Sequence, residues 1–436
     1  MKIMDDFVKT LNIIISEISS STSLYSVSSK DFTRNRKLPF ERLINFIIGM
    51  QGQSICKEIF DCFKDYDLMT PSAFVQQRAK LKSEAFEYIF HEFNNRCSDT
   101  ITTDGYRLYA LDGSDLNVPT NDNPYTHIAH LEKGYDMFHI NALYDISNDI
   151  YSDIIIQPIL KTNEPGAAVQ VVDRHEFPMN SIILADRGYP ALNLLEHINR
   201  KDNVDYLFRC KNDYISEIKK LPMMELDKEI SFELRTTQTN EDKEAYRSNK
   251  AKYISGKSKF GKYKKSQTWD FESPYKITLR VVRFRLSTGE YETIITSLDR
   301  FRFPIEKIKE LYHLRWGIET SFRTLKYAVG MINLHSTKED SILQEIWSSF
   351  IMYNLSSRIA STIIIEKRNT KWSYKVDMAL VIHICFSLFR SSSTSGEPPP
   401  EYYNYIKSNF LPIRPGRKDE RKIAPKKVVC FNYRVS

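Results

Sequence analysis

The segment 311–326 concentrates four side chains whose chemistry could act on one substrate. It combines a phenol, a guanidinium, a carboxylate and an ammonium, contributed by Tyr312, Arg315, Glu319 and Lys326. On a helical wheel of about 100° per residue that starts at residue 311, these groups fall at roughly 100°, 40°, 80° and 60°. A helix would therefore present them as one polar stripe to a cleft. An i, i+4 ion pair of Arg315 with Glu319 could also be purely structural.

An apolar stripe on the same helix is expected to face the core. Its members are Ile308, Leu314, Ile318, Phe322, Leu325 and Val329. Arg323 falls at the outer edge of the polar stripe, near ~120°, so we expect it to be more solvated than its neighbours.

Two aspartates follow strand-like stretches and stand close to a glycine. Asp112 precedes Gly113, and Asp186 is separated from Gly188 by one arginine. Carboxylates at strand ends of an open α/β sheet lie where such folds place active sites, and a neighbouring glycine lets the chain turn away. An aspartate before glycine is also a common turn residue, and this alternative stays open.

Positive charge is concentrated in two segments, although the whole chain carries only +7. The segment 247–265 holds eight basic residues and no acidic one, with Tyr253, Phe260 and Tyr263 among them. The tail from Arg414 adds eight more basic residues. Coulomb attraction and ring stacking suit a polyphosphate partner, while a solvated basic loop is the alternative. The candidate DNA-binding lysines of the first segment are Lys257, Lys259, Lys262, Lys264 and Lys265.

The composition is that of a folded chain with several domains. Of the 436 residues, 42% are hydrophobic and 27% charged, with 14 Gly and 17 Pro, which excludes a largely disordered or collagenous protein. No apolar run reaches the roughly 18 residues of a membrane span, and no signal peptide is evident, so we expect a cytoplasmic protein without membrane contact. The six cysteines form no CxxC motif, which argues against a zinc site or a disulfide framework.

The periodicity predicts helices first and a mixed sheet afterwards. Residues 35–96 are helical in pattern, with Thr70 and Pro71 as an N-cap and first-turn pair. The helix that follows carries polar groups that could read base edges or form the wet face of a bundle: Gln76, Gln77, Arg78 and Lys80. Strand-like stretches then alternate with helical ones, which predicts an α/β sheet. The strands are expected at 106–111, 139–144, 151–157, 182–185 and 206–210, and the helices at 164–175 and 191–200.

The spacing Tyr312-x2-Arg315-x3-Glu319-x6-Lys326, preceded by Asp112-Gly and Asp186-Arg-Gly-Tyr, resembles the signature of DDE transposases of the insertion-sequence four family. The similarity spans about residues 30 to 360. The resemblance implies an α/β fold with a ribonuclease-H-like catalytic core and a β-rich insertion between the second aspartate and the glutamate.

The resemblance also implies roles for these residues. Asp112, Asp186 and Glu319 would be the catalytic carboxylates and would hold two Mg²⁺ or Mn²⁺ ions, which suit hard oxygen ligands. Tyr312, Arg315 and Lys326 would hold backbone phosphates near the cut.

Two further DNA contacts are candidates. Arg209, at the end of a strand, could reach a phosphate or form a surface ion pair. Trp269, beside the basic loop, could stack a displaced base, as could Trp316, although a core position is the alternative for both. We favour Trp269, because Trp316 lies outside the polar stripe.

We therefore expect a cut-and-paste insertion-sequence transposase, acting on terminal inverted repeats and target DNA as a homodimer in the bacterial cytoplasm, associated with the nucleoid. The alternatives are a catalytically silent DNA-binding derivative and a site-specific nuclease without strand transfer. The expected divisions are a helical DNA-binding domain (1–100), the first part of the core (101–210), the β-rich insertion (211–299), the second part of the core with the catalytic glutamate (300–365), and a C-terminal helical region with a basic tail (366–436).

Overall fold

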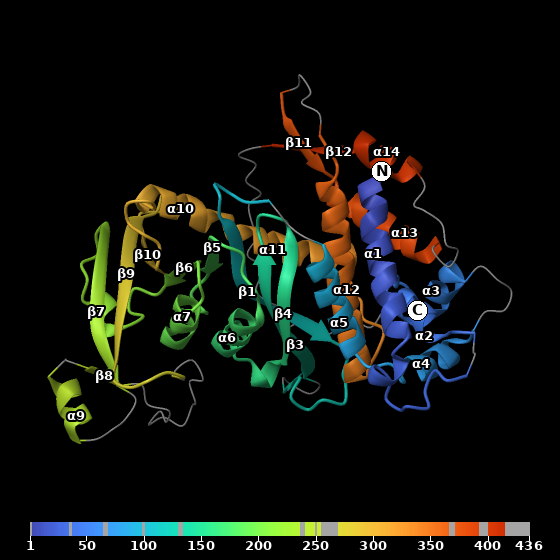
Figure 1. The fold of residues 1–436 in the computed structure, drawn as a ribbon, viewed down its shortest axis with the longest axis horizontal. Coiled ribbons are helices and arrows are strands. Elements are labelled where there is room, and N and C mark those ends of the chain that lie inside the picture. The colour runs from blue at the N-terminus through green and yellow to red at the C-terminus, as the bar shows by residue number, and fades with distance from the viewer. Residues whose placement is uncertain are drawn as a thin grey trace.

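The computed structural model describes a mixed α/β protein built around one large sheet (Figure 1). The described residues are 2–34, 37–63, 69–97, 101–129, 134–235, 240–248, 251–253, 269–365, 371–391 and 400–414. The lysines 257, 259, 262, 264 and 265 and the tail beyond 414 lie outside them. Within the described ranges, no helix combines the length and the apolar character needed to cross a bilayer.

Among the described residues, the central sheet has ten strands. Its main path runs β2-β3-β1-β5-β6-β10-β9-β7-β8, and β4 pairs with β3. Strand β1 is parallel to β5, which is parallel to β6, whereas β3 is antiparallel to both β1 and β4. The strands are β1 (Arg107–Val118), β2 (His127–Ile128), β3 (Tyr135–Asp145), β4 (Ile150–Pro158), β5 (Ser181–Ala185), β6 (Val204–Cys210), β7 (Leu226–Arg235), β8 (Ala251–Tyr253), β9 (Tyr275–Arg285) and β10 (Tyr291–Thr296). All the strands expected from the sequence are therefore present, several of them longer than expected.

The strands between residues 211 and 299 extend this sheet. Strand β10 pairs antiparallel with β6 of the expected core, and β9 and β7 follow in turn. The β-rich character expected of this segment is present, and its hydrogen bonding is continuous with the first part of the sheet.

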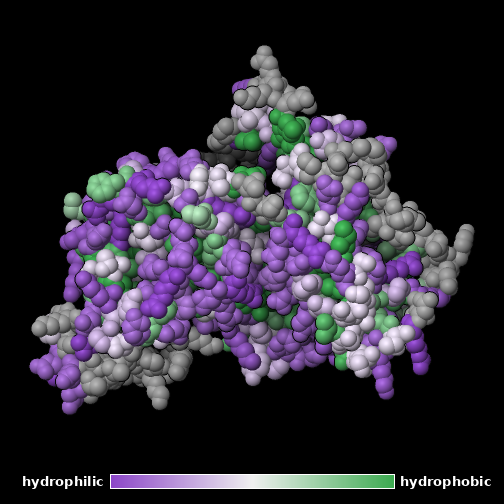
Figure 2. Space-filling model, viewed as in Figure 1, coloured by the Kyte–Doolittle hydropathy of each residue, from purple (hydrophilic) through white to green (hydrophobic). Residues whose placement is uncertain are grey.

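Helices cover both faces of the sheet. On one face, α6 (Glu164–Arg174) and α7 (Leu192–Asn199) bury an apolar cluster with alternate residues of β1, β5 and β6. These two helices lie in front of the sheet in Figure 1, and Figure 2 shows a mostly hydrophilic surface over them. On the other face, α10 (Ile305–Leu314) covers β5, β6 and β10, while α11 (Trp316–Arg323) and α12 (Glu339–Ser361) cover the β1, β3 and β4 side.

The N-terminal and C-terminal helices share one apolar core with α12. They run side by side at one end of the molecule in Figure 1. Their bounds are α1 (Lys2–Ser19), α2 (Phe40–Ile48), α3 (Ile55–Cys62), α4 (Pro71–Arg78), α5 (Glu84–Arg96), α13 (Met378–Ser391) and α14 (Pro400–Ser408). The remaining elements are α8 (Ser216–Lys219), α9 (Asn240–Arg247), three short 3-10 or π segments, η1 (Thr22–Leu24), η2 (Ile159–Lys161) and η4 (Thr324–Val329), and the hairpin of β11 (Ser373–Val376) and β12 (Phe410–Ile413). Helix α1 was not predicted.

Helix α4 begins as its sequence predicts but does not present all its polar groups to solvent. The Thr70 side chain caps it by accepting a hydrogen bond from the Ala73 N–H at 3.2 Å. Gln77 and Arg78 are buried, and Gln77 donates to the carbonyl of Leu38. The interpretation of these two residues as readers of base edges is therefore wrong, because their polar atoms are used inside the protein.

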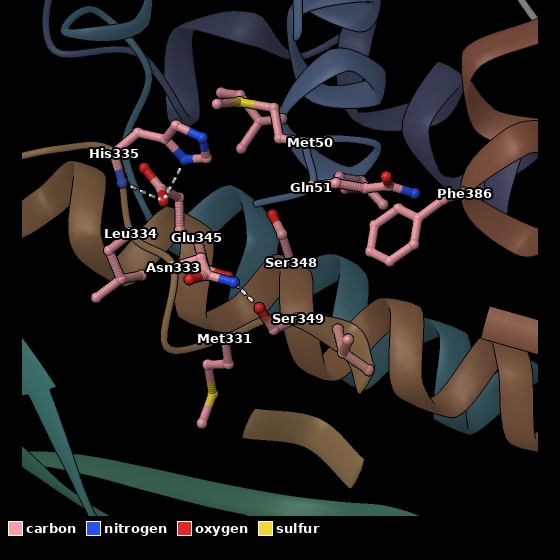
Figure 3. A pocket seen from close by; sticks show the side chains of 14 residues that line it. Met50, Gln51, Met331, Asn333, Leu334, His335, Glu345, Ser348, Ser349 and Phe386 are labelled. Carbon is pink, nitrogen blue, oxygen red and sulfur yellow. Dashed lines mark hydrogen bonds and ion pairs between the residues drawn. The ribbon is translucent and has the colours of Figure 1, made fainter. Parts of the chain in front are cut away.

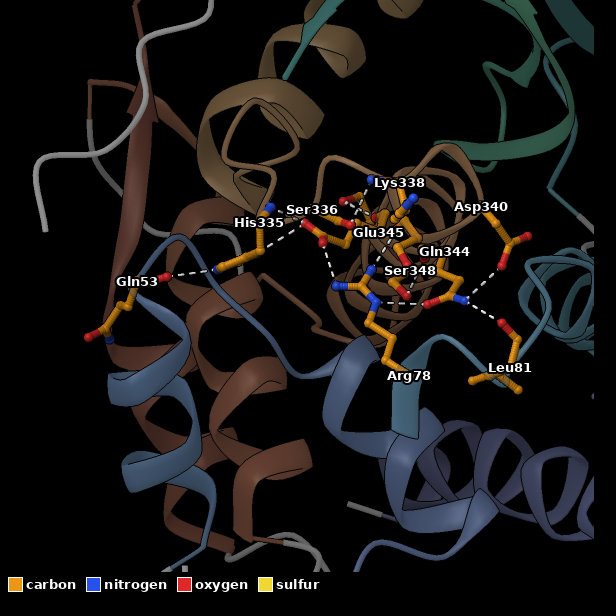
Figure 4. A network of polar contacts seen from close by, with 12 residues as sticks. Gln53, Arg78, Leu81, His335, Ser336, Lys338, Asp340, Gln344, Glu345 and Ser348 are labelled. Atoms are coloured by element: carbon orange, nitrogen blue, oxygen red, sulfur yellow. Dashed lines mark hydrogen bonds and ion pairs between the residues drawn. The ribbon is translucent and has the colours of Figure 1, made fainter. Parts of the chain in front are cut away.

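Arg78 is the centre of a buried polar network that joins α4 to α12 (Figure 4). Its guanidinium donates to Gln344 Oε1 at 2.8 Å and to Glu345 Oε1 at 2.7 Å. The other oxygen of Glu345 accepts from the backbone N–H of His335 at 2.8 Å, and His335 Nε2 lies 2.7 Å from the Gln53 carbonyl. The network thus connects the N-terminal helices to the segment that follows η4.

A small cavity adjoins this network (Figure 3). It is lined by side chains that include Met50, Met331, Glu345 and Phe386, and its volume is about 20 Å³. Because that is room for about one water molecule, the cavity is too small to be a substrate site.

The helix expected over residues 308–329 is interrupted. Helix α10 ends at Leu314, and the chain turns through Arg315 before α11 begins. The N–H of Arg315 bonds to the Tyr312 carbonyl at 3.1 Å, and the N–H of Ile318 bonds to the Arg315 carbonyl at 3.2 Å. Such i to i+3 bonds tighten the helix to about three residues per turn and change its phase. Leu314, expected in the core, is consequently 37% exposed.

Candidate active site

Asp112 and Asp186 are neighbours on adjacent parallel strands. Leu111 of β1 is in register with Ala185 of β5, so the residues that follow them, Asp112 and Asp186, lie side by side. Both side chains lie on the face of the sheet that α10 covers. Leu108 and Leu184, which precede them by an even number of residues, belong to the core under that helix. Asp186 ends its strand as expected. Asp112 does not, because β1 continues to Val118.

The neighbouring glycines make room for side chains of the opposite face. A Cβ at Gly113 would lie 2.5 Å from His139 Nε2, and one at Gly188 would lie 2.5 Å from Glu164 Oε2. His139 itself bonds to Asp115 through Nδ1 at 2.7 Å. Gly113 therefore permits the close approach of the imidazole, and the expectation that it turns the chain away from the sheet is wrong.

The turn between α10 and α11 directs Arg315 between two carboxylates. Its Nη2 donates to Glu319 Oε1 at 2.8 Å, and its Nη1 lies 3.6 Å from Asp112 Oδ2. Arg315 is buried, with 5% of its surface exposed, whereas Glu319 and Asp112 are partly exposed. The hydroxyl of Tyr312 donates to Asp186 Oδ1 at 3.3 Å. Near this turn, the two aspartates, the glutamate, the phenol and the guanidinium therefore lie close together.

Lys326 and Arg209 border the same group. Lys326 Nζ donates to the carbonyl of Asp115 at 2.6 Å, three residues beyond Asp112 on β1. Arg209 Nη1, from β6, lies 3.6 Å from Asp186 Oδ1. The structure therefore brings together seven of the residues singled out in the sequence.

Trp269 lies elsewhere. It packs against Phe271 and Tyr275 and belongs to the apolar cluster on the α6 and α7 face, opposite the carboxylates. Its indole N–H donates to the Glu272 carbonyl at 3.0 Å. Trp316, by contrast, directly follows Arg315 and is 45% exposed.

Burial, together with the neighbouring charges, shifts the pKa values of groups in the site. Burial raises the pKa of Asp112 to about 6; the Gly113 N–H and Arg315 oppose this shift, and Glu319 and Asp186 add to it. Burial also raises the pKa of Tyr312, which therefore stays a neutral hydrogen-bond donor. Burial lowers the pKa of Lys326. The carboxylates are thus close enough to interact but are separated by a fixed cation.

Comparison with known proteins decides the family. The sequence model described as "Transposase DDE domain" matches residues 103–355, more than half of the chain. The chain belongs to this family of DDE transposases. The resemblance to the insertion-sequence four family is confirmed by transposase InsG for insertion sequence element IS4 of Escherichia coli (strain K12). That relative is 23% identical over 344 residues, which cover 74% of this chain and 70% of the relative.

Two further similarities are more limited. A probable transposase for insertion sequence element IS5377 of Geobacillus stearothermophilus is 33% identical over 76 residues, which cover 17% of this chain and 20% of that protein. The other is to the cryo-EM structure of a piggyBac transposase synaptic complex with hairpin DNA. The match covers 98% of this chain and 86% of the chain in that structure, at 11% sequence identity and a TM-score of 0.44. As a DDE transposase of an insertion sequence, the chain is an enzyme of metal-dependent DNA cleavage and strand transfer.

The carboxylates of the transposase fit a divalent cation by their chemistry. Asp112, Asp186 and Glu319 offer hard oxygen donors from one face of the sheet and from α11. Within the part of the chain that the structure describes, no three His, Cys, Asp or Glu residues are already gathered closely enough to hold an ion. At this site the guanidinium of Arg315 lies 3.6 Å from Asp112 and 2.8 Å from Glu319.

One acidic residue of the transposase site was missed in the sequence. Glu292 of β10 is buried, 7% exposed, and its Oε2 lies 3.4 Å from Arg209 Nη2. The available signal was its alternation with Ile294 and Thr296, which predicts an inward-facing carboxylate. Such a position is easily overlooked, because a glutamate at the start of a strand is usually solvated.

Proposed function

We propose that this transposase excises its element at the terminal inverted repeats and inserts it into target DNA, with Asp112, Asp186 and Glu319 as metal ligands. The observation that carries the proposal is the convergence of these carboxylates with Tyr312 and Arg315 at one edge of the sheet. The strand order β4-β3-β1-β5-β6, with β3 antiparallel and the last two strands parallel to β1, supports a ribonuclease-H-like core. The domain boundaries expected from the sequence belong to the same proposal.

The side chains have separate tasks in this mechanism. When bound, two Mg²⁺ or Mn²⁺ ions would activate the attacking water or 3′-hydroxyl and neutralise charge on the leaving oxygen. Asp112 would serve both ions, and Asp186 and Glu319 would serve one each. Arg315 would hold the phosphate through its guanidinium, which lies 2.8 Å from Glu319 and 3.6 Å from Asp112. The hydroxyl of Tyr312 donates a hydrogen bond to Asp186 Oδ1 and would orient that carboxylate.

DNA binding extends beyond the site in this proposal. Arg209 and Lys326 border the carboxylates and would contact neighbouring phosphates. The basic segment with Lys257, Lys259 and Lys262 and the C-terminal tail would add sequence-independent attraction. Because two element ends must be joined, we propose a homodimer on DNA, acting on nucleoid DNA in the bacterial cytoplasm.

A product assay tests the function. The purified protein is incubated with linear DNA that carries both element ends, a target plasmid, and Mg²⁺ or Mn²⁺. We expect excised ends joined to the plasmid, and no product after chelation of the metal. Released ends without plasmid joining would indicate a nuclease, and end binding without cleavage would indicate a silent DNA-binding derivative; either result would contradict the proposal.

Substitutions along the helix test the phosphate contacts. Arg315→Ala and Lys326→Ala should each slow single-turnover cleavage by roughly 10-fold to 150-fold, the loss expected for one charge-assisted contact of about 1.5–3 kcal/mol. Thr324→Ala is the matched control, because its hydroxyl only bonds to the Thr320 carbonyl at the surface. Arg323→Ala should have a smaller effect than Arg315→Ala, since Arg323 is exposed. A Thr324→Ala protein as slow as Arg315→Ala would contradict the assignment.

A further inference from the structure

Four polar side chains lie on the face of the sheet that α10 covers, next to the apolar core under this helix. Asp112, Asp186, Arg209 and Glu292 come from β1, the end of β5, β6 and β10, which are consecutive in the sheet. Each lies two or four residues along its strand from an apolar residue of the core under α10: Leu108, Leu184, Leu207 and Ile294. Since alternate residues share a face, the four polar groups lie on the face toward α10, in a line that steps two residues along β10 from Ile294, the partner of Arg209, to Glu292. Arg209 therefore stands between Asp186 and Glu292.

Arg209 forms an ion pair with each of these two acids, but both distances are longer than those of good hydrogen bonds. Its Nη1 lies 3.6 Å from Asp186 Oδ1, and its Nη2 lies 3.4 Å from Glu292 Oε2. Its Nε is buried and has no hydrogen-bond partner among the described residues. Because neither carboxylate is bonded closely, the guanidinium can move toward either acid if the other loses its charge.

The two acids differ in burial. The side chain of Glu292 is 8% exposed, whereas that of Asp186 is 36% exposed. Burial raises the pKa of Glu292, and Arg209 is the first of the cations that oppose this. A charge pair is stronger where water is excluded, so Glu292 holds Arg209 more firmly than Asp186 does.

We propose that Glu292 is a positioning residue that draws Arg209 away from Asp186 and so keeps the Asp186 carboxylate open to a divalent cation. This inference rests on the proposed role of Asp186 as a metal ligand. Without the Glu292 charge, Arg209 pairs with Asp186 instead. The guanidinium then competes with the cation for the carboxylate oxygens of Asp186. Glu292 thereby acts on the site through Arg209, without touching DNA or metal.

Binding of Mn²⁺ alone to the purified protein, measured by titration calorimetry, tests this role independently of activity. Glu292→Gln should weaken Mn²⁺ binding by roughly 10-fold, the size typical of changes in groups that orient metal ligands. Glu292→Asp, which keeps the charge, should bind Mn²⁺ more tightly than Glu292→Gln. Glu290→Gln, at an exposed position two residues away, should bind like the unmodified protein.

A double substitution separates positioning from a structural role. If Arg209 is the competitor, Glu292→Gln combined with Arg209→Gln should recover Mn²⁺ binding to within about threefold of the unmodified protein. Arg209→Gln alone should bind Mn²⁺ at least as tightly as that protein, and this variant serves as the test if Glu292→Gln does not fold. Unchanged binding in Glu292→Gln, no recovery in the double variant, or weaker binding in Arg209→Gln would overturn the inference.

A further variant distinguishes failure of this inference from failure of the proposed function. Asp186→Asn should bind Mn²⁺ far more weakly than the unmodified protein. If Asp186→Asn binds Mn²⁺ weakly while Glu292→Gln binds it like the unmodified protein, only the proposed role of Glu292 is wrong. If Asp186→Asn binds normally, the assignment of Asp186 as a metal ligand falls as well.

Discussion

Replacing Asp112, Asp186 or Glu319 by its amide should reduce DNA cleavage by at least about 10³-fold and leave end binding largely intact. A bound cation contributes several kcal/mol of charge stabilisation to phosphodiester cleavage, and each ~1.4 kcal/mol is tenfold in rate. The amides keep the size of the carboxylates but lose the charge that holds the ion. Because the side chains of Asp112 and Asp186 are partly exposed to solvent, their loss of charge should not unfold the protein.

The measurement is single-turnover cleavage of a terminal-repeat duplex together with gel-shift binding. Glu310→Gln is the matched control, since Glu310 is an exposed acid on α10. If an amide variant still cuts DNA at a rate near that of the unmodified protein, the substituted residue is not one of the three metal ligands.

Replacing Arg78 by Met should lower the free energy of unfolding by about 3–5 kcal/mol, the usual cost of removing one partner from a buried ion pair. The substitution leaves the Glu345 carboxylate buried without its guanidinium and removes three donated hydrogen bonds that join α4 to α12. Urea unfolding measures the change. Gln76→Met on the exposed side of α4 should change stability by less than about 0.5 kcal/mol.

The effect of Arg78→Met should depend on pH in a defined direction. Burial raises the pKa of Glu345, but the charges of Arg78 and His335 more than offset this and lower it to about 2, from an ordinary value of 4.5. A lowered pKa stabilises the folded state fully above about pH 4.5, and the contribution is lost as the pH falls toward 2. The difference between the two proteins should therefore shrink over that range. A constant difference would show that Arg78 stabilises the fold through packing alone.

The sequence by itself determined the parts of this protein that depend on local spacing. The Thr70 cap, the helices that follow it and the strands β1 and β3 to β6 were predictable, because capping and hydrophobic periodicity act over a few residues. The spacing of Tyr312, Arg315 and Glu319 was enough to select the family, and Asp112 and Asp186 stand upstream in the order that the resemblance requires.

Only the tertiary structure decided how these residues meet. The interruption at Arg315 cannot be seen from a helical wheel, because the wheel assumes one phase throughout. The wheel places Arg315 beside Glu319, but only the packing of this segment on the sheet puts the guanidinium next to Asp112 of β1. The length of β1 through Gly113 depends on pairing with β3, which starts more than twenty residues later. Arg78 and Glu292 look like solvated residues in the sequence, yet both are buried against oppositely charged groups. Such partners are far apart along the chain, and packing of the helices and strands alone brings them together.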